Sequence, residues 1–184
     1  MMFKLNPAPI PGLYEIHPRI LSDPRGRFVK TLHRDQFADL GLRSDFAEEY
    51  YSLSGPGVLR GLHFQVPPEE HVKLVYCIQG EVWDVVLDLR KGSPTYLQHA
   101  VFELSAKQGN MVYIPAGCAH GFCVPKGEAV LVYKVTSVYS PQHDHGVLWN
   151  SAGIPWPLAN PQLSERDGLF PPLAEFDSPF TYSP

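Results

Sequence analysis

The chain has 184 residues, of which 44% are hydrophobic, which is enough for one domain with a packed core but not for two full domains. Its 19 Pro and 15 Gly are spread along the sequence and argue against a helical bundle. A formal net charge of −4 gives no general attraction for nucleic acid or an anionic membrane. No apolar run approaches the roughly 20 residues that span a bilayer, and no signal peptide is recognisable. We therefore expect a cytoplasmic protein with neither a nucleic-acid nor a membrane partner.

Short apolar or alternating runs, separated by turn residues, fill the chain from about Tyr50 to Trp149. They predict strands over residues 58–64, 72–78, 82–89, 99–104, 111–114, 120–124 and 129–138. Strands at this spacing favour an antiparallel sandwich or barrel, and the Gln79-Gly80 connection predicts a tight hairpin turn. Before them, residues 35–42 are expected to form a short helix capped by Asp35.

The segment from Trp156 onward is rich in proline and is poorly suited to ladder strands. Its pattern favours an irregular tail packed on the barrel, in which Ser164 caps a single turn over residues 165–167. The three cysteines, Cys77, Cys118 and Cys123, are odd in number and contain no C-x-x-C pair. They are therefore expected to be buried thiols and not a disulfide framework or a zinc site.

Two segments place polar side chains in otherwise apolar strands. One is GVLRGLHFQ, residues 57–65, and the other runs from Gly109 to His120 with the spacing G-x5-P-x-G-x2-H. Together they resemble the two cupin motifs, the second fully and the first in part. This resemblance implies an all-β fold, a cupin-type jelly roll (double-stranded β-helix) with short peripheral helices and the Pro-rich C-terminal tail.

A metal cupin would normally have a further histidine where this chain has Gln65. His63 and His120 could still face each other, with Glu69 or His71 as a third ligand, but divalent metals normally take three or more clear protein ligands. We therefore predict no bound metal and no cofactor. A metal-dependent oxygenase or isomerase is the alternative.

A metal-free barrel leaves His63 as a candidate general base, because an unperturbed imidazole titrates near neutral pH. Arg60, Lys73 and Tyr133 lie on strands that could share its cavity, where buried cations would be costly without a ligand. Arg60 and His63 have opposite parity and would face opposite sides of a regular strand. A bulge at Gly61 would reset the alternation.

Five segments, two of which overlap those above, together resemble the dTDP-4-dehydrorhamnose 3,5-epimerase family of sugar-nucleotide epimerases: GVLRGLHFQVPP, VKLVYCIQGEVWDVVLDLRKGSPTY, IPAGCAHGF, YSPQHDHGVLWNSAGIPWP and LSERD. The resemblance extends from Asp23 to Asp167. It implies a cofactor-free, metal-free homodimer that epimerises nucleotide-linked 4-keto-6-deoxyhexoses at C3, C5 or both. It also implies that the chain is a single domain, with N-terminal strands and a dimer-exchange segment in residues 1–48, the jelly-roll core in 49–150 and the tail that supplies Asp167 in 151–184.

The same resemblance implies roles for individual residues. His63 is the base that removes the proton next to the C4 ketone, and Asp167 orients it. Lys73 stabilises the enolate oxygen, and Tyr133 returns a proton on the opposite face. The residues implied to hold substrate are Arg60, His120 and Tyr139 within the subunit, and Arg25 and Phe28 across the dimer interface.

Four positions depart from the family pattern where it surrounds the nucleotide. Lys30 stands in place of a glutamate, Tyr50 in place of an asparagine, and Glu48-Glu49 in place of Gln-Asp. Because these changes alter local charge and hydrogen-bond polarity, we hypothesise that the base is not necessarily thymine, and that CDP- and GDP-linked sugars are candidate partners beside dTDP sugars.

Two further hypotheses remain at this point. A 3,4-ketoisomerase of a nucleotide-linked keto sugar would share the base but need no acid on the opposite face, and a non-catalytic sugar-nucleotide-binding cupin would need neither. Tyr133 with Asp167 argues against the ketoisomerase, and the intact set of His63, Lys73, Tyr133 and Asp167 argues against the binding protein. His143 and His145 are taken as surface residues, although their spacing could suggest a metal pair.

Overall fold

The computed structural model describes residues 2–184, and most of its regular elements are strands. The elements are β1 (Phe3–Pro7), β2 (Tyr14–Pro18), β3 (Ile20–Asp23), β4 (Gly26–Val29), α1 (Arg34–Asp39), β5 (Glu48–Ser54), β6 (Leu59–Gln65), β7 (Lys73–Gln79), β8 (Glu81–Asp88), β9 (His99–Ser105), β10 (Met111–Ile114), β11 (Cys118–Cys123), β12 (Ala129–Val135), β13 (Asp144–Gly146), α2 (Glu165–Gly168) and the 3-10 helix η1 (Leu173–Glu175).

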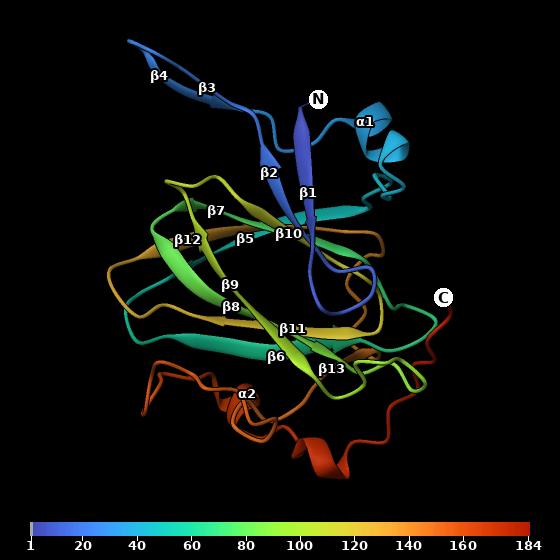
Figure 1. Ribbon diagram of the computed structural model, residues 1–184. Helices are drawn as coiled ribbons and strands as arrows, with labels where there is room; N and C mark the ends of the chain where they lie inside the picture. The colour runs from blue at the N-terminus through green and yellow to red at the C-terminus, as the bar shows by residue number, and fades with distance from the viewer. Residues whose placement is uncertain (1) are drawn as a thin grey trace.

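Two antiparallel sheets face each other and form the jelly roll (Figure 1). The larger sheet has the order β1-β2-β10-β7-β12-β5, and the smaller has the order β13-β6-β11-β8-β9. Alternate side chains of both sheets point inward and form the central core, which includes Val75, Val86, Phe122 and Leu131. The predicted fold class is therefore confirmed.

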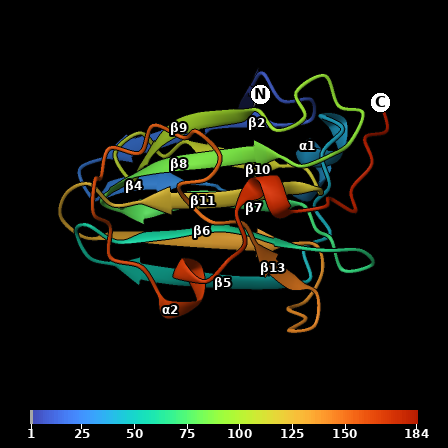
Figure 2. The ribbon, with the colours of Figure 1, turned by 90° about the horizontal axis from the view of Figure 1, so that it is seen from below.

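The outer faces of the two sheets are covered by the ends of the chain. Helix α1 packs Phe37 against Phe3 on the larger sheet, with ring centroids 5.1 Å apart. The C-terminal tail crosses the outer face of the smaller sheet, where Phe180 packs against Phe64 (Figure 2). This cover keeps the apolar outer face of β6 dry and brings α2 beside the strand that carries His63.

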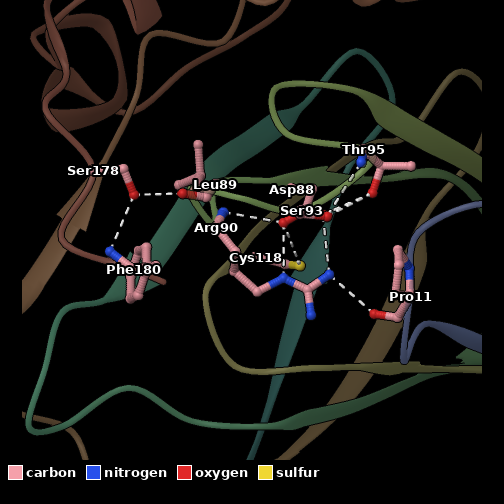
Figure 3. A network of polar contacts seen from close by, with 9 residues as sticks. All are labelled: Pro11, Asp88, Leu89, Arg90, Ser93, Thr95, Cys118, Ser178 and Phe180. Atoms are coloured by element: carbon pink, nitrogen blue, oxygen red, sulfur yellow. Dashed lines mark hydrogen bonds and ion pairs between the residues drawn. The ribbon is translucent and has the colours of Figure 1, made fainter. Parts of the chain in front are cut away.

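A buried polar network anchors this tail at the end of β8 (Figure 3). The carboxylate of Asp88 is fully buried and accepts hydrogen bonds from Arg90, at 2.8 and 3.0 Å, and from the hydroxyls of Ser93 and Thr95, at 2.6 and 2.8 Å. Ser178 in the tail donates to the carbonyl of Leu89. The charge of Asp88 is thus fully compensated, as a buried carboxylate requires.

Strands β3 and β4 pair only with each other among the described residues and form an arm that projects away from the two sheets (Figure 1). Its large apolar side chains are exposed, Leu21 to 48% and Phe28 to 60%. An exposed apolar arm of this kind is typical of a segment that contacts another chain.

All seven predicted strands are present. The ends of β10 coincide with the prediction, and the other strand ends differ by at most three residues, the largest difference being the last, which stops at Val135. The predicted hairpin at Gln79-Gly80 is wrong: β7 and β8 lie in different sheets, and the turn carries the chain from one sheet to the other. Gly80 has φ +74°, and a Cβ there would lie 2.0 Å from the carbonyl oxygen of Glu128. Neither β5 nor β13 was predicted.

The two predicted caps had different outcomes. Helix α1 begins at Arg34 with His33 as its N-cap, so the prediction that Asp35 caps it is wrong. Asp35 lies in the first turn, where its negative charge interacts favourably with the helix dipole. The hydroxyl of Ser164 accepts a hydrogen bond from the backbone N–H of Asp167 at 3.1 Å, which confirms the second cap. The three cysteines are buried and free, as predicted.

Candidate active site

A cavity of about 350 Å³ opens between the two sheets. The predicted residues His63, Lys73 and Tyr133 all line it, from β6, β7 and β12. Its remaining lining side chains are Glu48, Tyr50, Ser52, Arg60, Phe64, Gln65, His71, His120, Phe122, Val135, Tyr139, Asp144 and Arg166. A concave site with convergent polar and titratable groups is the usual form of a small-molecule site.

His63 is paired with Asp167, which lies 104 positions later in the sequence. The ring Nε2 lies 2.7 Å from a carboxylate oxygen of Asp167, and the other carboxylate oxygen accepts the backbone N–H of Gly61 at 3.3 Å. Burial alone would raise the pKa of Asp167, but these hydrogen bonds hold it below its ordinary value. The aspartate therefore stays charged and fixes the imidazole orientation.

A β-bulge lets Arg60 and His63 share the cavity. On β11, His120 pairs with His63 and Phe122 pairs with Arg60, so β6 contains one residue more than β11 between the same two pairs. The extra residue resets the alternation, as predicted from Gly61. Gly61 has φ +126°, and a Cβ on it would lie 2.6 Å from the Cα of Gly121. Only glycine fits this approach of the two strands.

Lys73 is a nearly fully buried cation, 6% exposed, at the start of β7. Its Nζ donates to the backbone carbonyl of His63 at 3.2 Å. Burial lowers the pKa of Lys73 to about 8, against the opposing effect of the Asp144 and Asp84 carboxylates. At neutral pH the ammonium group is still mainly charged and lies in a low-dielectric cavity, where it can stabilise a developing anion.

Tyr133 lies on the larger sheet, opposite the sheet that carries His63. Its hydroxyl is 3.2 Å from the hydroxyl of Ser52, and its ring meets that of His120 edge to face at 6.0 Å. Burial raises the pKa of Tyr133 well above its ordinary value, so the phenol is neutral and carries a transferable proton.

His120 forms a second imidazole-carboxylate pair. Its Nε2 lies 2.7 Å from a carboxylate oxygen of Asp84, a residue with no solvent exposure. Sequence analysis missed Asp84, although a carboxylate inside the apolar run EVWDVV was a signal that it has a buried partner. The pair orients His120 toward the cavity across the strand from His63.

Charged groups surround the rim of the cavity. The guanidinium Nε of Arg60 donates to the hydroxyl of Ser54 at 2.9 Å. Arg166 pairs with Asp144 at 2.7 Å, and both residues were missed by sequence analysis. The N–H of Tyr139 donates to Glu48 at 2.7 Å, which holds this exposed ring at the rim.

Three predicted substrate-binding residues, Arg25, Phe28 and Lys30, do not line the cavity of their own chain. Arg25 and Phe28 belong to the β3-β4 arm, and Lys30 directly follows it. The guanidinium of Arg25 forms an ion pair with Asp23 on the same arm. Their predicted contact with the nucleotide of a neighbouring subunit stays a prediction.

The metal-dependent alternative named His71 as a possible ligand, and the spacing of His143 and His145 could suggest a metal pair. His71 Nδ1 lies 3.0 Å from the hydroxyl of Ser137, and His143 Nδ1 lies 2.7 Å from that of Ser140. His145 is exposed, as predicted, and His143 is partly exposed. Among residues 2–184, no group of three His, Cys, Asp or Glu side chains is arranged to hold a metal ion. No helix in that range has the length and apolarity needed to cross a membrane.

The fold and the site define a cupin-type protein whose cavity contains an imidazole on one sheet and a phenol on the other, an arrangement suited to proton transfer on a small molecule. A sequence model described as dTDP-4-dehydrorhamnose 3,5-epimerase matches residues 7–175, and the chain belongs to this family of isomerases of deoxysugar biosynthesis.

Individual relatives agree with this assignment. The chain is 42% identical to a dTDP-4-dehydrorhamnose 3,5-epimerase of Shigella flexneri over 86% of its length and 89% of that protein. It is 41% identical to a dTDP-4-dehydrorhamnose 3-epimerase of Streptomyces niveus over 89% of its length and 81% of that protein. It also resembles the structure of a dTDP-6-deoxy-D-glucose-3,5-epimerase from Legionella pneumophila in complex with dTDP-4-keto-L-rhamnose, with a TM-score of 0.94, 34% identity, and coverage of 99% of this chain and 100% of that one.

Proposed function

We propose that this protein epimerises a nucleoside diphosphate 4-keto-6-deoxyhexose by removing a proton next to the C4 ketone and returning one to the opposite face. The observation that carries the proposal is the position of His63 and Tyr133 on opposite sheets of one cavity. A sugar ring between them would present one face to the base and the other face to the acid.

In the first step, Nδ1 of the neutral His63 imidazole, whose Nε2–H donates to Asp167, takes the proton from the carbon beside the ketone. The electron pair of the broken C–H bond forms a C=C bond, and the carbonyl π electrons move to the C4 oxygen. Asp167 stabilises the imidazolium, and the Lys73 ammonium stabilises the enolate oxygen. Both charges that develop thus have a partner of opposite sign before the reaction begins.

In the second step, the Tyr133 hydroxyl donates its proton to the same carbon from the other face. The enolate electrons return to form the C=O bond, and the configuration of the carbon is inverted. The tyrosinate regains a proton and the imidazolium loses one through water, which restores the starting protein. The strongly raised pKa of Tyr133 makes its anion costly and so favours this return.

Arg60, His120 and Tyr139 are proposed to hold the sugar and the diphosphate. A guanidinium at the rim suits a phosphate group, because its planar N–H groups match phosphate oxygens. His120 is held by Asp84 and is available to a sugar oxygen deeper in the cavity. This division leaves the nucleotide at the mouth of the cavity and the reacting carbons near His63.

The relatives support dTDP as the nucleotide: the Streptomyces niveus and Shigella flexneri proteins are named for dTDP sugars, and the Legionella pneumophila protein was solved with one. Lys30 and Tyr50 depart from the family pattern near the expected nucleotide position, so CDP- and GDP-linked sugars belong in the test. The relatives include enzymes named for C3 and C5 and for C3 alone; we propose inversion at both carbons for this chain.

We further propose that the protein works as a homodimer in which the β3-β4 arm of one subunit contacts the nucleotide of the other. The arm exposes Phe28 and Leu21, which a monomer would leave in water. Arg25 on the same arm would bring a cation to the diphosphate. Size-exclusion chromatography with light scattering is expected to give a dimer, and a strict monomer that is fully active would contradict this part of the proposal.

Proton NMR in D2O tests the reaction directly. The protein is incubated with dTDP-, CDP- and GDP-linked 4-keto-6-deoxyhexoses, and deuterium incorporation at C3 and C5 is followed together with the configuration of each carbon. Incorporation with inversion, fastest for the dTDP sugar, is expected. A shift of the keto group to C3 would instead identify a 3,4-ketoisomerase, and binding without exchange would identify a non-catalytic protein.

A further inference from the structure

Tyr133 shares its position in the cavity with a second tyrosine. Tyr50 on β5 is its direct cross-strand partner, and the two rings are stacked with centroids 4.8 Å apart and an interplanar angle of 16°. Stacked aromatic pairs across strands restrict each other's side-chain rotation. The acid of the proposed reaction is therefore held by an aromatic neighbour that does not belong to the proposed proton-transfer path.

The stack has an inner and an outer ring. β5 is the edge strand of the larger sheet and β12 is the next strand inward, so Tyr50 lies outside Tyr133. Tyr50 is 40% exposed, whereas Tyr133 is only 7% exposed. The Tyr50 ring thus covers the face of the Tyr133 ring that points toward the edge of the sheet and keeps solvent away from it.

Apart from its packing in the central core, Tyr133 has two further contacts, and neither supports the ring face that Tyr50 covers. Its hydroxyl has one hydrogen bond, to Ser52, and His120 meets the ring edge to face. Neither contact lies flat against the ring. Without Tyr50, the ring could turn about its Cα–Cβ bond and move the hydroxyl out of line with the reacting carbon, and water could reach the phenol.

We propose that Tyr50 is a positioning residue that holds the Tyr133 ring in line for proton donation and so decides what fraction of deprotonated substrate is inverted. The inference rests on the proposed epimerase function and adds a residue to it. Tyr50 is proposed to act through its ring, which stacks on that of Tyr133.

The chemistry gives a direct measure of this role. After proton removal, the enolate is either protonated by Tyr133 on the opposite face, which inverts the carbon, or takes a solvent-derived proton back from His63, which does not. A misaligned Tyr133 therefore increases exchange with retention relative to inversion. Positioned acids contribute about 10²- to 10⁴-fold, and a misalignment of about 1 Å can cost about 10²-fold.

The experiment compares wild type with Tyr50→Ala, Tyr50→Phe and Tyr133→Phe in D2O, using the ratio of inverted product to substrate that has gained deuterium with retained configuration. Tyr50→Ala is expected to lower this ratio about 10- to 100-fold with little change in KM, and Tyr50→Phe to restore it to within about twofold of wild type. Tyr96→Ala, in the loop between β8 and β9 and away from the cavity, is the matched control and should behave as wild type.

Several results would overturn the inference. A wild-type ratio in Tyr50→Ala would show that Tyr133 needs no aromatic support. A raised KM with an unchanged ratio would make Tyr50 a substrate contact, and a loss of inversion in Tyr50→Phe would assign the role to its hydroxyl. Failure of wild type to epimerise any sugar would instead refute the proposed function. If wild type is active and Tyr133→Phe is impaired, the proposed function holds, and the results with the Tyr50 variants then test the role of Tyr50 alone. Circular dichroism of each variant checks that it is folded.

Discussion

Replacing Lys73 by methionine is expected to inactivate the protein and also to make it more stable. The side chain is 6% exposed, and burial lowers its pKa from the ordinary 10.5 to about 8. This shift corresponds to about 3 kcal/mol of cost for holding the charged form in the folded protein at neutral pH. Methionine has a similar length and volume and carries no charge, so it removes this cost.

Two opposing contributions reduce the gain. The Nζ of Lys73 donates to the carbonyl of His63, and losing such a bond costs about 1 kcal/mol. Asp84 and Asp144 also lose a nearby cation. We therefore expect the free energy of unfolding of Lys73→Met to exceed that of wild type by about 2 kcal/mol at pH 7.

The pH dependence gives this prediction a sign that packing alone would not produce. Between about pH 8 and 10.5, the folded protein releases the Lys73 proton while the unfolded chain keeps it. The unfolded state then binds more protons, so wild-type stability rises with pH relative to the variant. The advantage of Lys73→Met should be complete below pH 8 and shrink by ~1.4 kcal/mol per pH unit above it.

Urea denaturation at pH 7.0 and 9.5 measures both values. The protein concentration is kept fixed, because the proposed dimerisation would contribute to stability. Lys126→Met, at an exposed position, is the control and should change stability little at either pH. Epimerase activity of Lys73→Met is expected to fall at least about 10²-fold. A variant less stable than wild type at pH 7, or a gain that does not shrink at pH 9.5, would refute the reasoning.

Three further predictions concern single buried groups. Asp167→Asn should lower kcat about 10²- to 10⁴-fold, because the amide neither fixes the tautomer nor stabilises the imidazolium of His63. Because the pKa of Asp167 is lowered in the folded protein, its charge stabilises the folded state above the ordinary aspartate pKa, and this contribution is lost as the pH falls through the folded pKa. Urea titrations should therefore show that the stability of Asp167→Asn falls less with acid than that of wild type. Gly61→Ala should lower the free energy of unfolding by more than about 2 kcal/mol and abolish activity, since its Cβ would lie 2.9 Å from the His120 carbonyl oxygen. Gly55→Ala is the control and should be neutral, because its Cβ meets nothing within 4 Å. Thermal melts and the NMR assay compare the two variants. Asp88→Ala should lower the free energy of unfolding measured in urea by about 3–5 kcal/mol, because it leaves the buried guanidinium of Arg90 without its counter-ion.

The core strands were predictable because their inward positions alternate with outward ones. Strand β12 is an example: Leu131 and Tyr133 point into the central core, while Val132 belongs to the cluster on the opposite face of the sheet. The crossing at Gly80 was not predictable, because a two-residue turn between strands has the same local sequence whether it joins neighbours or changes sheets. Connectivity of that kind depends on pairing between distant strands.

The site shows the same division between local and distant information. His63, Arg60 and the bulge at Gly61 lie within one short segment, so their relation was visible in the sequence. Asp167 was connected to His63 only through the family resemblance, since the two residues are 104 positions apart. Asp84 was missed because its partner His120 lies on another strand, and a lone carboxylate does not identify its partner.

Each of the two imidazoles of the cavity has its own carboxylate. His63 and His120 are direct cross-strand partners on β6 and β11. Asp167 and Asp84 approach from different directions, one from the C-terminal tail and one from β8, and each lies 2.7 Å from its histidine. Each carboxylate orients its own imidazole, so the loss of Asp84 leaves the contact between Asp167 and His63 in place. A double variant that removes both carboxylates should therefore lose about the product of the two single losses in kcat, and a loss far from that product would show that the two pairs are coupled.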